Sequence, residues 1–193
     1  MLFDLLEKNR SYRNFDSAGK ISREVLEGLV RAARLCPSAS NLQTLKYYLS
    51  CEEETNRQIL DDLRFAGALK DKKFPYPGKE ATAYVVICHD TRISASPERF
   101  WKDVGIVAQT MMLAAAELGL GGCMVGSMNQ VKIQEVLSMP DNLLPQLILM
   151  LGKPAERVKI VTAEDGNVTY FREEDDTHVV PKRPLAELII NKE

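Results

Sequence analysis

Three short segments of this sequence carry residue types that could bind a phosphate group. Residues 9–15 read Asn-Arg-Ser-Tyr-Arg-Asn-Phe, and residues 181–185 read Pro-Lys-Arg-Pro-Leu. Between them along the chain, residues 37–41 read Pro-Ser-Ala-Ser-Asn. Arginine presents a planar fork of N–H donors that matches the oxygens of a phosphate. If the fold brings the two cationic segments together, they predict a site for a phosphorylated cofactor, and therefore an enzyme.

Each segment also has a simpler interpretation when it is taken alone. The arginines could be surface cations that follow a helix, and residues 37–41 could be only a helix-ending turn. The pair Gly121 and Gly122 could be a helix cap followed by the start of a strand. Lys182 and Arg183 could serve only to keep their segment solvated. The joint occurrence of these segments, in this order, favours a binding site.

The motifs of several common enzyme classes are missing. Residues 119–124 place glycine in the first two positions of G-x-G-x-x-G, but Met124 occupies the last. This segment also follows an expected helix, whereas the dinucleotide fingerprint follows a strand. The sequence has no G-x-x-x-x-G-K-[ST], G-x-S-x-G or H-E-x-x-H motif. Rossmann, P-loop, serine-hydrolase and zincin chemistry are therefore not expected, and no catalytic residue is assigned.

Composition narrows the class of protein further. A chain of 193 residues, 45% of them hydrophobic, predicts one domain over residues 1–193 with a sizeable core. A formal charge of −2 gives no broad cationic surface for nucleic acid. The four cysteines are widely spaced and the histidines number two, so we expect reduced thiols, no metal site and a cytoplasmic protein.

Hydrophobic periodicity predicts an alternation of helices and strands. The expected helices cover residues 2–9, 23–36, 54–69, 98–118 and 131–137, with Ser22 as the N-cap of the second. The expected strands cover residues 45–51, 83–88, 121–127 and 146–151. The apolar stretch 104–125 contains Gln109, Thr110 and Glu117, so we interpret it as a buried helix and not as a membrane span. This alternation predicts an α+β or mixed α/β fold.

Three further segments have no regular periodicity or are very short. Residues 70–80 form a polar loop with two prolines, which we expect to be a mobile cover. The acidic run 172–176 is interpreted as a solvated loop, in a segment where Asp165-Gly166 predicts a turn. Residues 185–190 are apolar and short, and we expect them to dock onto a sheet or a neighbouring subunit.

The ordered set of segments resembles the FMN-dependent nitroreductase family over nearly the whole chain. The residues that carry this resemblance are the 9–15, 37–41, 119–122 and 181–185 segments. The resemblance implies an α+β fold with a central mixed sheet flanked by helices. It also implies a homodimer in which the C-terminal segment is exchanged, with FMN at the subunit interface.

The same resemblance implies roles for individual residues. It implies that the FMN phosphate is held by Arg10, Ser11 and Arg13, with help from Lys182 and Arg183. It implies that the flavin is lined from the other subunit by Ser38, Ser40, Asn41 and the Pro37 carbonyl. Gly121 and Gly122 would offer backbone donors near the ring, because glycine lets the main chain approach a flat ligand closely.

The sequence departs from the family pattern at three places. Asn9 stands where the family often has the first of two arginines. Gln43 and Thr44 stand where Gln-Pro-Trp is frequent, which affects the substrate side of the pocket. The order Lys182-Arg183 replaces Arg-Lys, so the sequence leaves open which cation meets the phosphate.

The activity implied by the resemblance is a two-stage hydride transfer. NADH or NADPH would reduce the flavin and leave, and a small oxidised acceptor such as a nitroaromatic or a quinone would then bind in the same pocket. Two alternatives stay open at this point. The chain could be a specialised enzyme on the same scaffold, for reductive dehalogenation or flavin breakdown, or a non-catalytic FMN-binding protein.

Overall fold

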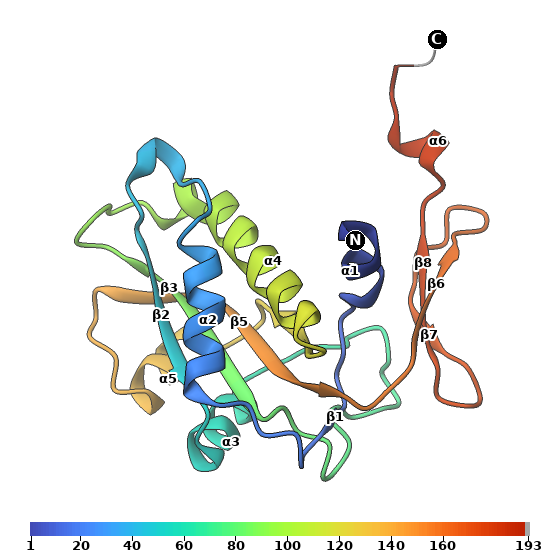
Figure 1. Cartoon of the computed structure of the whole chain (residues 1–193), viewed down its shortest axis with the longest axis horizontal. Helices are drawn as coiled ribbons and strands as arrows, with labels where there is room; N and C mark the ends of the chain where they lie inside the picture. The colour runs from blue at the N-terminus through green and yellow to red at the C-terminus, as the bar shows by residue number, and fades with distance from the viewer. Residues whose placement is uncertain (192–193) are drawn as a thin grey trace.

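A five-stranded sheet forms the centre of the protein, in a computed structural model that describes residues 1–191 (Figure 1). Its long strands pair antiparallel in the order β2 (Leu45–Ser50), β3 (Ala83–Asp90), β5 (Leu143–Pro154) and β4 (Gly121–Val125). The short β1 (Phe15–Asp16) pairs antiparallel with the end of β5. A parallel bridge between Ser11 and Gly122 adds to the β4 edge and makes the sheet mixed.

Helices cover both faces of this sheet. On one face lie α2 (Arg23–Ala33) and α4 (Trp101–Glu117), and on the other lie α3 (Glu53–Asp61) and α5 (Gln130–Val136) (Figure 1). The alternation of side chains along a strand explains this arrangement. In β3, Val85 and Ile87 pack with the α2 and α4 residues, whereas Tyr84 and Val86 pack with the α3 and α5 residues. The predicted α+β fold with a flanked central sheet is confirmed.

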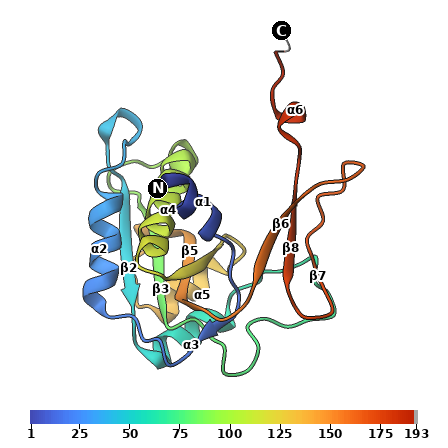
Figure 2. The same ribbon diagram turned by 45° about the vertical axis from the view of Figure 1, so that its right-hand side comes forward.

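A small lobe stands beside this body. It consists of β6 (Val158–Thr162), β8 (His178–Lys182) and β7 (Phe171–Arg172), with β8 in the middle. Strand β6 runs parallel to β8, and β7 runs antiparallel to it. In both views the N-terminal helix α1 (Leu2–Lys8) lies between α4 and this lobe, and α6 (Leu185–Leu188) projects away from the body (Figures 1 and 2).

Two short 3₁₀ helices lie between the larger elements, at η1 (Ala39–Asn41) and η2 (Pro97–Phe100). Several predicted boundaries are confirmed closely. The hydroxyl of Ser22 accepts a hydrogen bond of 3.3 Å from the Val25 N–H and so caps α2 as expected. Asp165 and Gly166 both have positive φ, which is typical of the turn that the sequence predicts.

Other predictions were wrong at the ends of elements. The helix expected over 54–69 stops at Asp61, because Leu63 leaves the helix to pair with Met128 and the Arg64 N–H donates to the Ser127 carbonyl at 2.9 Å. Strand β5 is longer than expected because it has partners on both sides. Strands β6 and β8 were not expected, and β8 contains Pro181, a residue type that argues against a central strand.

Within residues 1–191, no helix combines the length and the apolar character that crossing a membrane requires. The single domain over 1–193 and the exchange of the C-terminal segment stay predictions, and residues 192–193 lie outside the described part of the chain. The segment expected to dock elsewhere leaves its large apolar side chains exposed. These are Leu185, Leu188, Ile189 and Ile190.

Candidate functional site

The two cationic segments face one cavity of about 220 Å³. The cavity is bounded by the segment after α1, by α4, by the edge strand β4 and by the small lobe. Its lining residues are Asn9, Arg10, Ser11, Gln109, Met112, Gly122, Met124, Val158, Val180 and Lys182. Four predicted site residues therefore come together: Arg10, Ser11, Gly122 and Lys182.

Arg10 is held at the end of α1. Its Nη2 donates a hydrogen bond of 2.5 Å to the Leu6 carbonyl oxygen, which belongs to the last turn of that helix. Its buried Nε has no hydrogen-bond partner within residues 1–191, and no carboxylate of these residues forms an ion pair with it. Because a guanidinium has five N–H donors, Arg10 retains both charge and donors for an anion in the cavity.

The glycines beside Arg10 are required by packing. A Cβ atom on Gly122 would collide with the Met150 carbonyl oxygen, and one on Gly121 would lie 2.7 Å from Cγ of Pro154. Both positions are therefore restricted to glycine by neighbours within the chain. The predicted role of Gly121 and Gly122 as backbone donors to a flavin ring stays a prediction.

Lys182 and Arg183 have different surroundings. Lys182 lines the cavity, and among the described residues its ammonium group has no ion-pair partner. Arg183 is absent from the cavity wall, and its Nη1 pairs with Oε2 of Glu187 at 3.1 Å. Adjacent residues of an extended chain point to opposite sides, so only one of the two can face the cavity. In this structure that residue is Lys182.

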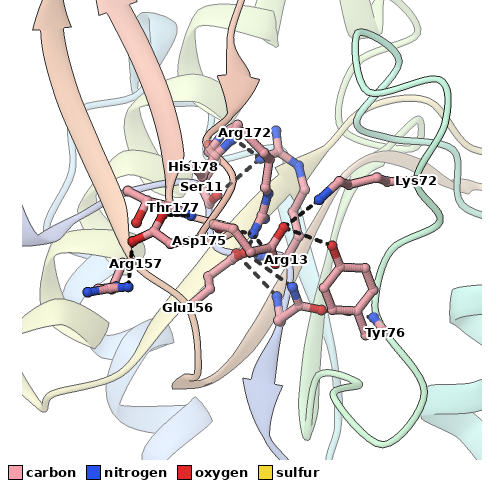
Figure 3. Close-up of polar contacts among 12 residues, drawn as sticks. Ser11, Arg13, Lys72, Tyr76, Glu156, Arg157, Arg172, Asp175, Thr177 and His178 are labelled. Carbon is pink, nitrogen blue, oxygen red and sulfur yellow. Dashed lines mark hydrogen bonds and ion pairs between the residues drawn. The ribbon is translucent and has the colours of Figure 1, made fainter.

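Arg13 does not line the cavity and lies beside His178 and Arg172 of the small lobe (Figure 3). It is buried, and its Nη1 lies 3.0 Å from Nε2 of His178 and 3.3 Å from the Ser11 carbonyl oxygen. Its guanidinium carbon also lies 5.2 Å from the centre of the Tyr170 ring. The structure thus does not bring Arg13 to the Arg10 side of the segment.

His178 is kept neutral by this environment. Burial, together with the positive charges of Arg13 and Arg172, lowers the pKa of His178 to about 4. A neutral ring can accept a hydrogen bond from Arg13 at Nε2, which a charged imidazolium could not do.

A buried ion pair between Glu156 and Arg172 lies next to Arg13 (Figure 3). The side chains are 3% and 2% exposed, respectively. The Glu156 carboxylate also accepts hydrogen bonds from the Arg13 and Asn14 backbone N–H groups. The sequence interpretation of residues 172–176 as a solvated loop was wrong for Arg172. No sequence signal distinguishes this arginine, because its burial depends on residues from other parts of the chain.

The loop over residues 37–43 lies apart from this cavity. The Ser38 hydroxyl donates a hydrogen bond of 2.7 Å to the buried carboxylate of Asp103, and the Ala39 N–H donates one of 3.0 Å to the same oxygen. Ser40, Asn41 and Gln43 adopt positive φ. Pro37 and Ser38 line a separate cavity of about 330 Å³. Within one chain, the structure therefore does not bring Pro37, Ser38, Ser40 and Asn41 to Arg10.

The loop over residues 70–80 is fastened to the small lobe and not free above the cavity. Lys72 pairs with Asp176 at 2.6 Å, and the Tyr76 hydroxyl donates to the same carboxylate oxygen at 3.1 Å (Figure 3). The Tyr76 backbone N–H donates to the Asn14 side-chain oxygen at 2.8 Å. These contacts connect the loop to the network around Glu156.

Comparison with known proteins identifies the relatives of this chain. The sequence profile of the Nitroreductase family matches residues 6–153. The chain belongs to the nitroreductase family. An Archaeoglobus fulgidus protein, assigned by inference as an NADH dehydrogenase/NAD(P)H nitroreductase, is 26% identical over 166 residues, which cover 83% of this chain and 90% of that protein.

Solved structures of nitroreductases share the fold. A nitroreductase family protein from Clostridium difficile is 25% identical, with a TM-score of 0.69 over 98% of this chain and 96% of that one. A structure assigned as an Exiguobacterium sibiricum nitroreductase, in complex with FMN, is 18% identical, with a TM-score of 0.66 over 81% of this chain and 89% of that one. The expected family, fold class and nitroreductase type of oxidoreductase are thereby confirmed, whereas the roles of single site residues stay predictions.

Proposed function

We propose that this nitroreductase binds FMN in the cavity beside Arg10 and passes hydride from NADH or NADPH to a small oxidised acceptor. The acceptor class is nitroaromatic or quinone, and donor and acceptor use the same pocket in turn. The observation that carries this proposal is the convergence of Arg10, Ser11 and Lys182 on one cavity. Two relatives support it, because the Archaeoglobus protein is named for NAD(P)H and the Exiguobacterium structure contains FMN.

The cavity fits the phosphate end of FMN. A phosphate monoester carries about −1.5 to −2 charges at neutral pH. Arg10 and Lys182 together supply two positive charges that no carboxylate of the described residues neutralises, and Ser11 adds a hydroxyl. Charge-assisted hydrogen bonds of this kind contribute roughly 1.5–3 kcal/mol each. In this proposal Arg13 and Arg183 are not phosphate ligands.

The chain's own residues bind and orient the cofactor. FMN, when bound, supplies the capacity to accept and donate hydride. Met112 and Met124 give the cavity an apolar side, and such a surface excludes water from the ring. Gly122 contributes to the cavity wall, and its missing Cβ atom leaves room for the Met150 carbonyl oxygen of the neighbouring strand. We assign no residue of this chain as a proton donor.

We further propose that the active form is a homodimer. A cavity of about 220 Å³ is smaller than the roughly 300–1,000 Å³ of typical small-molecule sites, so one chain provides only part of the site. Large apolar side chains are exposed on α1, on α4 and on the C-terminal segment: Leu2, Phe3, Trp101, Ile106, Leu188 and Ile190. A second subunit would cover these side chains, and its residues 37–41 would complete the flavin pocket.

A cytoplasmic location is part of the same proposal. All four cysteines are free thiols: Cys36, Cys51, Cys88 and Cys123. Free thiols persist in a reducing compartment, where NADH and NADPH are also available.

Flavin reconstitution tests the proposal directly. The purified protein is incubated with FMN, separated from free FMN on a desalting column, and scanned for flavin absorbance. Bound flavin bands are expected, and their absence would exclude FMN as the cofactor. Mixing the reconstituted protein with NADH or NADPH in a stopped-flow instrument should then bleach the bands. Bound FMN that neither nucleotide bleaches would leave an FMN-binding protein without this activity.

A further inference from the structure

The pairing of β1 with β5 brings two distant parts of the chain side by side just below the cavity. Phe15 pairs with Pro154, and the Ala155 N–H donates to the Asn14 carbonyl oxygen at 3.0 Å. The same antiparallel register places Arg13 opposite Glu156. Ser11 lies two residues before Arg13, and Val158 lies two residues after Glu156; both line the cavity. Arg13 and Glu156 therefore form the last paired position before these two segments of the chain separate around the cavity.

The Glu156 side chain accepts the hydrogen bonds that hold this contact together (Figure 3). Its Oε1 accepts from the Arg13 backbone N–H and, at 3.2 Å, from the Asn14 backbone N–H. Its Oε2 accepts from Nδ2 of Asn14 at 3.2 Å and from Nη2 of Arg172. One buried carboxylate thus binds the N-terminal segment and the small lobe at the same time.

The lobe carries the opposite wall of the cavity. Strand β6, which begins two residues after Glu156, pairs in parallel register with β8, so that Thr162 lies opposite Lys182. The Arg157 carbonyl oxygen accepts from the His178 N–H at 2.8 Å and fixes the start of β8. The position of Lys182 relative to Arg10 therefore depends on how the residues around Glu156 are held. These residues follow the segment matched by the family profile, which ends at 153.

We propose that Glu156 is a positioning residue of the cofactor cavity: its buried carboxylate holds the Ser11–Asn14 segment against the lobe and so sets the separation of Arg10 from Lys182. The inference rests on the proposed binding of the FMN phosphate between these two cations. It predicts that a change at Glu156 weakens binding of the phosphate end of the ligand and leaves binding of the rest of the ligand unchanged. The two buried guanidinium groups of Arg13 and Arg172 would repel each other without this carboxylate, which would open the junction.

Comparison of FMN with riboflavin, which lacks the phosphate, separates positioning from general stability. Dissociation constants for both ligands are measured by flavin fluorescence for the wild type and Glu156→Gln, at a temperature where each protein is folded. A second variant, Glu156→Leu with Arg172→Leu, removes the carboxylate without leaving its arginine partner unpaired. The matched control is Glu173→Gln, which breaks an exposed ion pair of the same lobe with Lys159.

We expect both Glu156 variants to lower the preference for FMN over riboflavin by about tenfold or more, with riboflavin affinity unchanged. The control should keep the wild-type preference. A Glu156 variant that loses affinity for both ligands equally, or that keeps the full preference, would overturn the positioning role. A wild-type protein without any preference for FMN would instead overturn the proposed phosphate site, and the inference with it.

Discussion

The backbone N–H of Tyr12 donates a hydrogen bond of 2.9 Å to the carbonyl oxygen of Gly122. This bond belongs to a parallel bridge between the N-terminal segment and β4. It brings Arg10 and Ser11 to the edge of the central sheet, beside Gly122. The cavity wall on this side is therefore fixed by backbone contacts and not by the side chains that face a ligand.

Gly122→Ala should destabilise the protein. The added methyl group would meet the Met150 carbonyl oxygen in the neighbouring strand, and overpacking of this kind costs about 1–3 kcal/mol or more. Gly105→Ala is the matched control, since a Cβ atom there meets nothing within 4 Å and alanine favours the helix by roughly 0.5–1 kcal/mol. Urea unfolding measures both effects. Equal stability of the two variants would contradict the packing argument.

Arg10→Ala should weaken FMN binding strongly. Loss of a charge-assisted hydrogen bond of roughly 1.5–3 kcal/mol corresponds to about a 10- to 100-fold higher dissociation constant. Arg31→Ala, an exposed arginine in α2, should leave the affinity unchanged. Fluorescence titration with FMN provides the measurement. Unchanged affinity in Arg10→Ala would exclude this residue from the phosphate site.

The variants Lys182→Ala and Arg183→Ala should distinguish the roles of these two adjacent cations in FMN binding. Only Lys182 lines the cavity, whereas Arg183 is paired with Glu187. We expect about a tenfold or larger loss of FMN affinity for Lys182→Ala and a change of less than about threefold for Arg183→Ala. The same titration at low and high salt checks the electrostatic origin. The reverse order of effects would show that the phosphate lies on the Arg183 side.

His178 should make the protein less stable as the pH falls from about 6.5 to about 4. Its pKa is lowered from 6.5 to about 4 in the folded protein, chiefly by burial and then by Arg13 and Arg172. Between these values the unfolded chain binds a proton that the folded chain does not, so stability rises with pH through the window and is constant above it. The variant His178→Gln can still accept from Arg13 but does not titrate. Its free energy of unfolding should therefore depend less on pH, and parallel curves for the two proteins would refute the assignment.

Charges on the C-terminal apolar segment should weaken the proposed dimer. In the double variant Leu188→Asp with Ile190→Asp, two exposed apolar side chains become charged, which disfavours their burial by a partner. Sedimentation velocity should show a dimer for the wild type and a larger fraction of monomer for the variant. Val168→Asp, an exposed position of the lobe, should sediment as the wild type does. A monomeric wild type at micromolar concentration would contradict the proposal.

Local patterns predicted the elements that depend on nearby residues. The Ser22 cap and the continuous apolar run of β3, which is buried throughout, follow from side chains within a few positions of one another. The end of α3 was missed because Leu63 pairs with a residue far along the chain. The predicted meeting of the two cationic segments relied on family resemblance, since no local rule connects Arg10 with Lys182.

The buried network around Glu156 could not be predicted from the sequence, for a physical reason. Glu156 and Arg172 have the residue types of an ordinary surface ion pair, and only the register of β1 with β5 and the packing of the lobe remove them from water. For the same reason Arg13 could not be separated from Arg10 by type or spacing. The side of the segment to which each arginine points depends on these tertiary contacts.

The cavity between the N-terminal segment and β8 also has a consequence for folding. A ligand that contacts both Arg10 and Lys182 would join parts of the chain that lie almost its whole length apart, as a reversible cross-link does. Such a ligand binds only the chain in which the lobe has already docked, so mass action would draw the population toward that form. The amount of available cofactor would then affect how long the lobe stays docked and protected from proteases. It would also set how much of the protein can catalyse the reaction.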